Sequence, residues 1–223
     1  MRKLLYNARL LTEGGLWPAG WVLIEDGRIG EIGQGTAPIP ADTARIDLQE
    51  SLLAPGMIDV HVHGALGVDV MDGKPESLRR MAGFYAQHGV TSFLATTTTA
   101  DPETLLAAVE NVARVMAKGT GGAALLGAHV EGPYIDSGRR GAQNATYIRP
   151  PQVEEYTRLF DTGVVRLMTL APELPGSEEL LRFALSRGAA VALGHTRASY
   201  EVARRAVEMG ANQVTHLFNG MEP

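Results

Sequence analysis

From Pro55 onward, short apolar runs alternate with amphipathic segments, and this alternation constrains the fold more than any other feature. The apolar runs are rich in Val, Leu, Ile and Ala, as expected of parallel strands that are covered on both faces. They are MIDVH, TSFLATTTT, ALLGAHV, VVRLMTL, AAVALGH and QVTH, which begin near residues 57, 91, 124, 164, 189 and 213. Strand–helix alternation of this kind predicts a parallel α/β fold.

Two architectures fit this alternation, an open doubly wound sheet and a (β/α)₈ barrel. The first strand is not followed by a glycine-rich phosphate loop, which argues against the dinucleotide-binding form of the open sheet. A barrel requires eight strands, and the chain offers six candidates.

The first 54 residues have a different sequence pattern. Short β-type runs are separated by turn residues, and Asp26-Gly27 between two of them is typical of a hairpin. We therefore predict a small antiparallel β unit over 1–54, separate from the α/β unit over 55–223.

Composition excludes several classes of site. The chain has no cysteine, so a metal would be held by His, Asp or Glu. Its net charge of −5 argues against general nucleic-acid or anionic-membrane binding. No stretch approaches the roughly 20 apolar residues that a membrane span requires. These properties predict no nucleic-acid or membrane partner and a cytoplasmic location.

Four of the six histidines lie at the carboxyl ends of candidate strands, together with one glutamate. His61 and His63 are two residues apart on an extended segment, so both side chains leave on one face. Glu131, His195 and His216 end later strands. A lone histidine at such a position is ordinarily a hydrogen-bonded structural residue. Five such groups together are costly to bury without a cation, which predicts a Zn²⁺ or Fe²⁺ site.

Other polar residues have two readings each. His88 precedes Gly89 and is expected to cap a helix or lie on the surface, whereas His129 either supports the site or is a satisfied core histidine. The loop with Arg139, Arg140 and Arg149 is either a solvated segment or a rim that attracts an anion.

Five segments of the chain together resemble the N-acetylglucosamine-6-phosphate deacetylases of the amidohydrolase superfamily. They are PGMIDVHVHG, GAHVEGPYI, RRGAQN, GHTRASYEVARRAVEMGA and THLFNGMEP. The resemblance implies a metal-bearing (β/α)₈ barrel and a small β-sandwich domain built from both chain termini. On this basis we expect an incomplete TIM-type barrel with six of eight strands, ending before strands seven and eight, and a β-sandwich portion over 1–54.

The resemblance also implies site residues. Glu131, His195 and His216 match the principal metal ligands, and His61 and His63 match the extra pair of members with a two-metal site. One or two ions of zinc or iron are expected. The positions matching sugar-phosphate contacts are Ala142, Gln143, Asn219 and Gly220. Gln143 replaces a histidine and Gly220 an alanine of some members. A homodimer is expected for the full-length protein.

The implied reaction is deacetylation of N-acetylglucosamine 6-phosphate by metal-activated water, which yields glucosamine 6-phosphate and acetate. The family's proton-shuttling aspartate has no match in residues 1–223, so we expect it beyond Pro223 and expect no catalytic residue in this chain. Two alternatives stay open: a non-catalytic metal-binding fragment, or another amidohydrolase of the dihydroorotase or deaminase type. Such enzymes carry a bridging ligand such as lysine on strand four, where VVRLMTLAPE has none.

Overall fold

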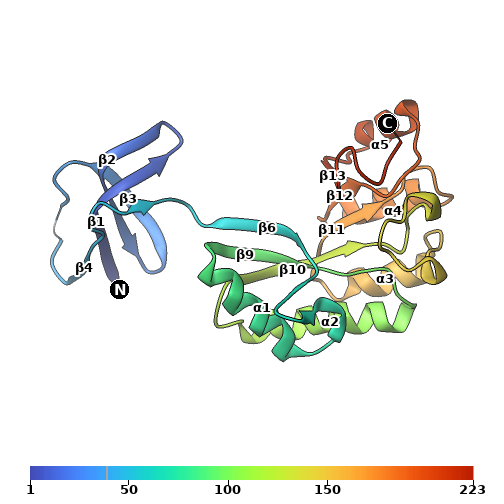
Figure 1. The fold of residues 1–223 in the computed structure, drawn as a ribbon, viewed down its shortest axis with the longest axis horizontal. Helices are drawn as coiled ribbons and strands as arrows, with labels where there is room; N and C mark the ends of the chain where they lie inside the picture. Colours follow the sequence, from blue (N-terminus) through green and yellow to red (C-terminus); the bar gives the residue numbers. More distant parts are fainter. Residues whose placement is uncertain (39, 223) are drawn as a thin grey trace. The chain divides into compact units, whose positions relative to one another are not determined.

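The computed structural model describes residues 1–38 and 40–222, so Pro223, the last residue of the THLFNGMEP motif, lies outside the described residues. The chain divides into two compact units, Met1–Gly56 and Met57–Pro223. Figure 1 labels the strands and helices of each unit, which are described separately here.

The first unit is one five-stranded sheet with the order β3-β2-β1-β4, in which β5 also pairs with β1. Its strands are β1 (Arg2–Thr12), β2 (Gly15–Glu25), β3 (Arg28–Gln34), β4 (Thr43–Asp47) and β5 (Leu52–Leu53). The predicted hairpin at Asp26-Gly27 joins β2 to β3, and both residues have the positive φ that such a turn requires. The expected antiparallel pairing is confirmed for β1, β2 and β3, but it is wrong for β4 and β5, which return through loops and pair with β1 in parallel.

The second unit is built on a six-stranded parallel sheet with the order β13-β12-β11-β10-β9-β6. The strands are β6 (Met57–Val62), β9 (Val90–Thr96), β10 (Ala124–Glu131), β11 (Val165–Leu170), β12 (Ala190–Leu193) and β13 (Gln213–Val214). Spatial order follows chain order throughout, whereas a doubly wound sheet reverses at a switch point. The prediction of six consecutive barrel strands is therefore confirmed over the doubly wound alternative.

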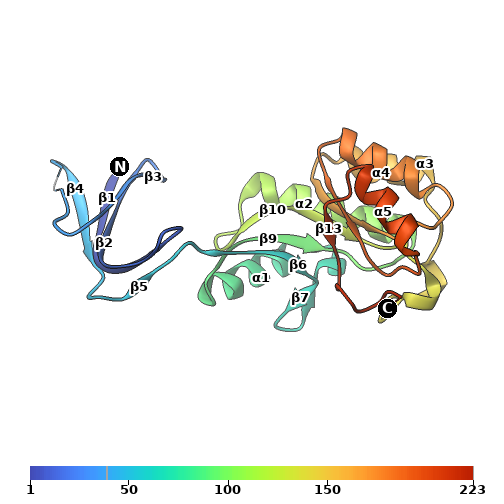
Figure 2. The same ribbon diagram turned by 90° about the horizontal axis from the view of Figure 1, so that it is seen from above.

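Helices connect these strands and cover one face of the sheet (Figure 2). They are α1 (Pro75–Gln87), α2 (Pro102–Lys118), α3 (Val153–Asp161), α4 (Ser177–Ser186) and α5 (Tyr200–Glu208). Shorter elements are the β7 (Gly64–Ala65) and β8 (Val68–Asp69) pair and the 3₁₀ turns η1 (Val70–Asp72), η2 (Ser137–Arg139) and η3 (Ala145–Tyr147). No helix in the part of the chain that the structure describes is long and apolar enough to cross a membrane.

Local signals set the helix ends. Asp101 accepts a hydrogen bond from the backbone N–H of Thr104 at 3.0 Å, and Pro102 begins α2. His88 ends α1, and its Nδ1 donates to the carbonyl of Phe84 at 2.8 Å, as expected of a capping residue.

The core of the second unit lies between the sheet and its helices, where Phe93, Leu105, Met168 and Leu180 are fully buried. The buried side chains on the opposite face include Thr96, His129, Thr169 and Thr215. The strand ends on this polar face carry the candidate site.

Candidate metal centre

The carboxylate of Glu131, at the end of β10, is the centre of a histidine cluster. Its side chain is 1% exposed. Oε1 lies 2.9 Å from Nε2 of His216 and 3.0 Å from Nε2 of His195. Nε2 of His61 lies 3.5 Å from the same oxygen, and Nε2 of His63 lies 3.1 Å from Oε2. All five residues predicted from the strand ends therefore meet around one carboxylate.

His61 and His63 reach the cluster because β6 is extended and its alternate side chains share a face. Their Nε2 atoms lie 3.2 Å apart. Asp59 accepts the backbone N–H of His61 at 3.1 Å, which orients the end of the strand. Nδ1 of His63 contacts the carbonyl of Thr96 on the neighbouring strand β9 at 3.2 Å, and this contact fixes the ring.

His195 and His216 follow the ends of β12 and β13, and both have left-handed backbones, with φ of 50° and 57°. This conformation is uncommon for residues with a Cβ and clusters at functional sites. It turns both rings toward Glu131, with ring centroids 5.1 Å apart. Nδ1 of His195 lies 2.9 Å from the carbonyl oxygen of Arg139.

Carbonyl contacts identify which ring nitrogens carry hydrogen. A carbonyl only accepts, so Nδ1 of His63 and of His195 must donate to Thr96 and Arg139. In a neutral ring the lone pair on Nε2 then faces the Glu131 carboxylate. Two electron-rich atoms at this distance need a proton or a cation between them. The chemistry of this donor set therefore fits a cation.

The titration of the cluster agrees with this reasoning. Burial alone would raise the pKa of the Glu131 carboxyl, but hydrogen bonds from His195, His61 and His63 outweigh it and hold that pKa far below its usual value. For His63 and His195, burial is outweighed by contact with Glu131, and the pKa of each ring is raised. At His216 burial prevails, and the pKa is lowered. The carboxylate thus stays charged and attracts positive charge.

The ligand atoms of His61, Glu131 and His216 all lie within 4.8 Å of one another. His195 and His63 contact the same carboxylate. Imidazole and carboxylate donors suit Zn²⁺ or Fe²⁺ better than Mg²⁺ or Ca²⁺.

His129 lies under the cluster rather than in it. Its Nδ1 donates to the carbonyl of Val60 at 3.1 Å, and its Nε2 accepts from the hydroxyl of Thr169 at 2.7 Å. Burial lowers its pKa to about 3, so the ring is neutral. Its centroid lies 4.8 Å from that of His61. His129 is a core histidine whose two ring nitrogens are both hydrogen-bonded, and it also packs against the candidate ligand His61. It therefore combines the two roles that the sequence left open.

The four predicted sugar-phosphate residues lie in different environments. Gln143 is buried and donates to Oε2 of Glu131 at 2.8 Å, whereas Ala142 is exposed. Asn219 is exposed and makes one long side-chain contact, 3.5 Å from its Nδ2 to the carbonyl of Leu217. Gly220 has a φ of 60°, which favours glycine, and a Cβ there would lie 3.6 Å from Nδ1 of His195. Its carbonyl accepts the backbone N–H of Thr196 at 3.0 Å.

The arginine loop is largely engaged in local pairs. Arg149 forms two hydrogen bonds to Glu155, at 2.8 and 2.7 Å, and is mostly buried. Arg139 pairs with Glu222 at 2.6 Å. Arg140 donates to the carbonyl of Gln143 at 3.1 Å and has no carboxylate partner within the described residues. Arg149 is therefore a structural residue of the loop.

Sequence reasoning missed two carboxylates next to the cluster, Asp136 and Glu173, which contact the segment after His195. The available signal was their position, since each follows the end of a parallel strand as the ligands do.

Residues 52–222 match the amidohydrolase family. The chain is 37% identical over 99% of its length to N-acetylgalactosamine-6-phosphate deacetylase of Escherichia coli O157:H7, of which it covers 58%. It is 35% identical over 99% of its length to N-acetylglucosamine-6-phosphate deacetylase of Bacillus subtilis, of which it covers 57%. The solved structure of N-acetylglucosamine-6-phosphate deacetylase from Pasteurella multocida superposes on the whole chain with a TM-score of 0.92 at 31% identity, and 58% of it is covered. The chain thus spans somewhat more than half the length of these proteins.

Proposed function

This chain belongs to the amidohydrolase family, and we propose that it provides the metal-binding part of a hydrolase that removes the acetyl group from N-acetylglucosamine 6-phosphate. The products are glucosamine 6-phosphate and acetate. The observation that carries this proposal is the Glu131 carboxylate enclosed by four imidazoles at strand ends. The relatives from Escherichia coli O157:H7 and Bacillus subtilis support the substrate class, because both are named as deacetylases of N-acetylated hexosamine phosphates.

Glu131, His195 and His216 would hold the principal ion, with His61 and His63 available for a second one. Zinc or iron is the proposed metal, and the cytoplasm remains the proposed location. A bound ion of this kind lowers the pKa of a coordinated water and polarises an amide carbonyl. A homodimer remains the proposed assembly of the whole protein.

The chain's own residues prepare this chemistry. Glu131 keeps its negative charge because the surrounding hydrogen bonds hold its pKa low. The carbonyl of Arg139 holds the proton on Nδ1 of His195 and leaves Nε2 directed to the centre. Ala142, Gln143, Asn219 and Gly220 are proposed to contact the sugar phosphate near the cluster.

The corresponding galactosamine compound is a second candidate substrate. The relative from Escherichia coli O157:H7 bears that name and is as similar to the chain as any relative cited here. The two sugars differ only in the configuration at C4. A dihydroorotase-like reaction is less favoured, because β11 carries no lysine to bridge two ions.

The test is acetate release by the chain and by a longer form of the protein. Each is assayed on N-acetylglucosamine 6-phosphate, N-acetylgalactosamine 6-phosphate and unphosphorylated N-acetylglucosamine. We expect the longer form to turn over a phosphorylated sugar and chelation to abolish that turnover, whereas the chain alone should bind the metal without turnover. Equal rates with and without the phosphate would contradict the proposed substrate class. Metal binding without turnover by either form would favour the non-catalytic alternative.

A further inference from the structure

Glu173 lies just after β11 and holds the two residues that follow His195. Its Oε2 accepts the hydroxyl of Thr196 at 2.5 Å. Its Oε1 accepts the backbone N–H of Arg197 at 2.6 Å. Bonds to an ionised carboxylate are shorter and stronger than those between neutral groups, so this segment is firmly held.

Asp136, after β10, holds the same segment from the other side. Its carboxylate accepts hydrogen bonds from Nε of Arg197 at 2.8 Å and from Nη2 of Arg197 at 2.9 Å, and Asp136 is mostly buried. The backbone N–H of Asp136 donates to the carbonyl of His195 at 2.8 Å. Three successive strand ends therefore converge on His195 and its neighbours.

His195 needs such support because its backbone is left-handed, a conformation that is unfavourable for a residue with a Cβ. If the segment relaxed to a common backbone conformation, the ring would turn away from Glu131. The hydrogen bond from Nδ1 to the Arg139 carbonyl would break with it.

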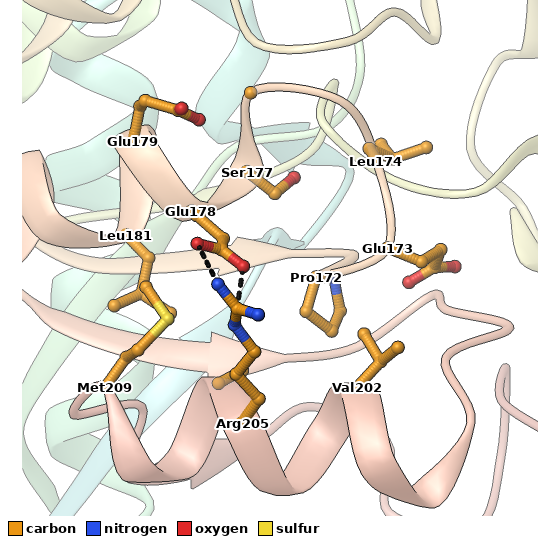
Figure 3. Close-up of a pocket in the computed structure, with 12 residues that line it drawn as sticks. Pro172, Glu173, Leu174, Ser177, Glu178, Glu179, Leu181, Val202, Arg205 and Met209 are labelled. Carbon is orange, nitrogen blue, oxygen red and sulfur yellow. Dashed lines mark hydrogen bonds and ion pairs between the residues drawn. The ribbon is translucent and has the colours of Figure 1, made fainter.

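Glu173 also lines a neighbouring cavity of about 390 Å³. The cavity lies between α4 and α5, and Figure 3 shows Arg205 bound to Glu178 across it, with Glu173 apart from this pair. Glu179 lines the same cavity from α4 and is exposed.

We propose that Glu173 is a positioning residue of the metal centre, which fixes the backbone and ring orientation of His195 through Thr196 and Arg197. This inference rests on the proposed function, because it takes His195 as a metal ligand. Residues that orient a ligand from outside the metal shell typically change metal affinity 10–100-fold when they are replaced.

The experiment measures zinc affinity by competition with a chromophoric chelator, and records the visible spectrum of the Co²⁺-loaded protein. The variants are Glu173→Gln, Glu173→Ala, Thr196→Val and Thr196→Ser. We expect the first three to bind zinc roughly 10–100-fold more weakly and to alter the Co²⁺ spectrum. Thr196→Ser keeps the hydroxyl and should retain both the zinc affinity and the Co²⁺ spectrum of the unaltered chain. Glu179→Gln is the matched control and should leave both unchanged.

Thermal unfolding of the metal-free variants separates positioning from general stability. A lower Tm with unchanged zinc affinity and an unchanged Co²⁺ spectrum would overturn the positioning role alone. If Glu173→Ala does not fold, the contrast between Thr196→Val and Thr196→Ser decides the question. Failure of the unaltered chain to bind zinc or Co²⁺ would overturn the proposed metal site and this inference together.

Discussion

The side-chain amide of Gln143 joins Glu131 to Thr99 in the loop after β9: its Nε2 donates to Oε2 of Glu131 at 2.8 Å, and its Oε1 accepts a hydrogen bond from the backbone N–H of Thr99 at 2.7 Å. Both ends of the amide are used, and the side chain is buried. Gln143 therefore sets the orientation of the central carboxylate, which leaves Oε1 facing His195 and His216.

Replacing Gln143 by alanine should weaken zinc binding about tenfold, as expected when a partner of a ligating carboxylate is lost. The buried N–H of Thr99 also loses its acceptor, which should lower the free energy of unfolding by about 1–3 kcal/mol. Chelator competition and urea unfolding measure the two effects. Gln87→Ala, at an exposed position of α1, is the control. Unchanged zinc affinity would show that Glu131 is oriented without Gln143.

The histidines and Gln143 show which parts of the candidate site can be predicted from the sequence and which cannot. His61 and His63 were predictable because an extended strand places alternate side chains on one face. His195 and His216 were predictable because parallel strands end at one edge. The contact of Gln143 with Glu131 was not predictable, because it depends on how the loop after β10 folds back over the end of that strand. That contact requires long-range geometry that no local pattern encodes.

The same limit applies to the support around His195. Glu173 and Thr196 lie in different strand-end loops, and their contact exists only because β11 and β12 are neighbours in register. In the first unit, the Asp26-Gly27 hairpin followed from local turn chemistry. The parallel return of β4 to β1 did not, because a long loop allows either direction.

Metal binding should stabilise the fold, and the effect should depend on Glu131. A ligand that binds only the folded state at 100 times its Kd stabilises it by about 2.7 kcal/mol. Zinc should therefore raise the Tm of the chain, and a chelator should reverse the rise. In Glu131→Gln the rise should be lost, because a neutral amide replaces the central anion. His88→Gln, which alters a histidine outside the cluster, should retain it. A rise that persists in Glu131→Gln would place the zinc elsewhere.

Alkaline pH should destabilise the fold partly through Tyr85. Burial, followed by the nearby charges of Asp59 and Asp69, raises the pKa of its phenol to about 12, from an ordinary value of 10.0. The neutral Tyr85 phenol contributes to stability in full below pH 10.0. This stabilisation is lost as the pH rises toward about 12, because the phenol ionises at lower pH in the unfolded chain than in the folded one. Tyr85→Phe should reduce the loss of stability between pH 10 and about 12, measured by urea unfolding. At pH 7 it should cost about 1 kcal/mol, since the bond of 3.1 Å to the Gly64 carbonyl is lost. Tyr200→Phe, at an exposed position, is the control.

Arg149 should matter for stability rather than for substrate phosphate. Its guanidinium forms two hydrogen bonds to Glu155 and donates to the carbonyl of Ala100 at 2.9 Å, which ties the loop after β10 to the end of β9 and to α3. Arg149→Met should lower the free energy of unfolding by about 2–3 kcal/mol, because a mostly buried carboxylate loses its partner. The double variant Arg149→Met with Glu155→Gln should recover part of this loss.

If Arg149 instead formed an anion rim, Arg149→Met would raise the KM for the phosphorylated sugar while leaving stability unchanged. Urea unfolding of the chain and acetate-release kinetics of the longer form distinguish the two outcomes, with Arg80→Met at an exposed position of α1 as the control.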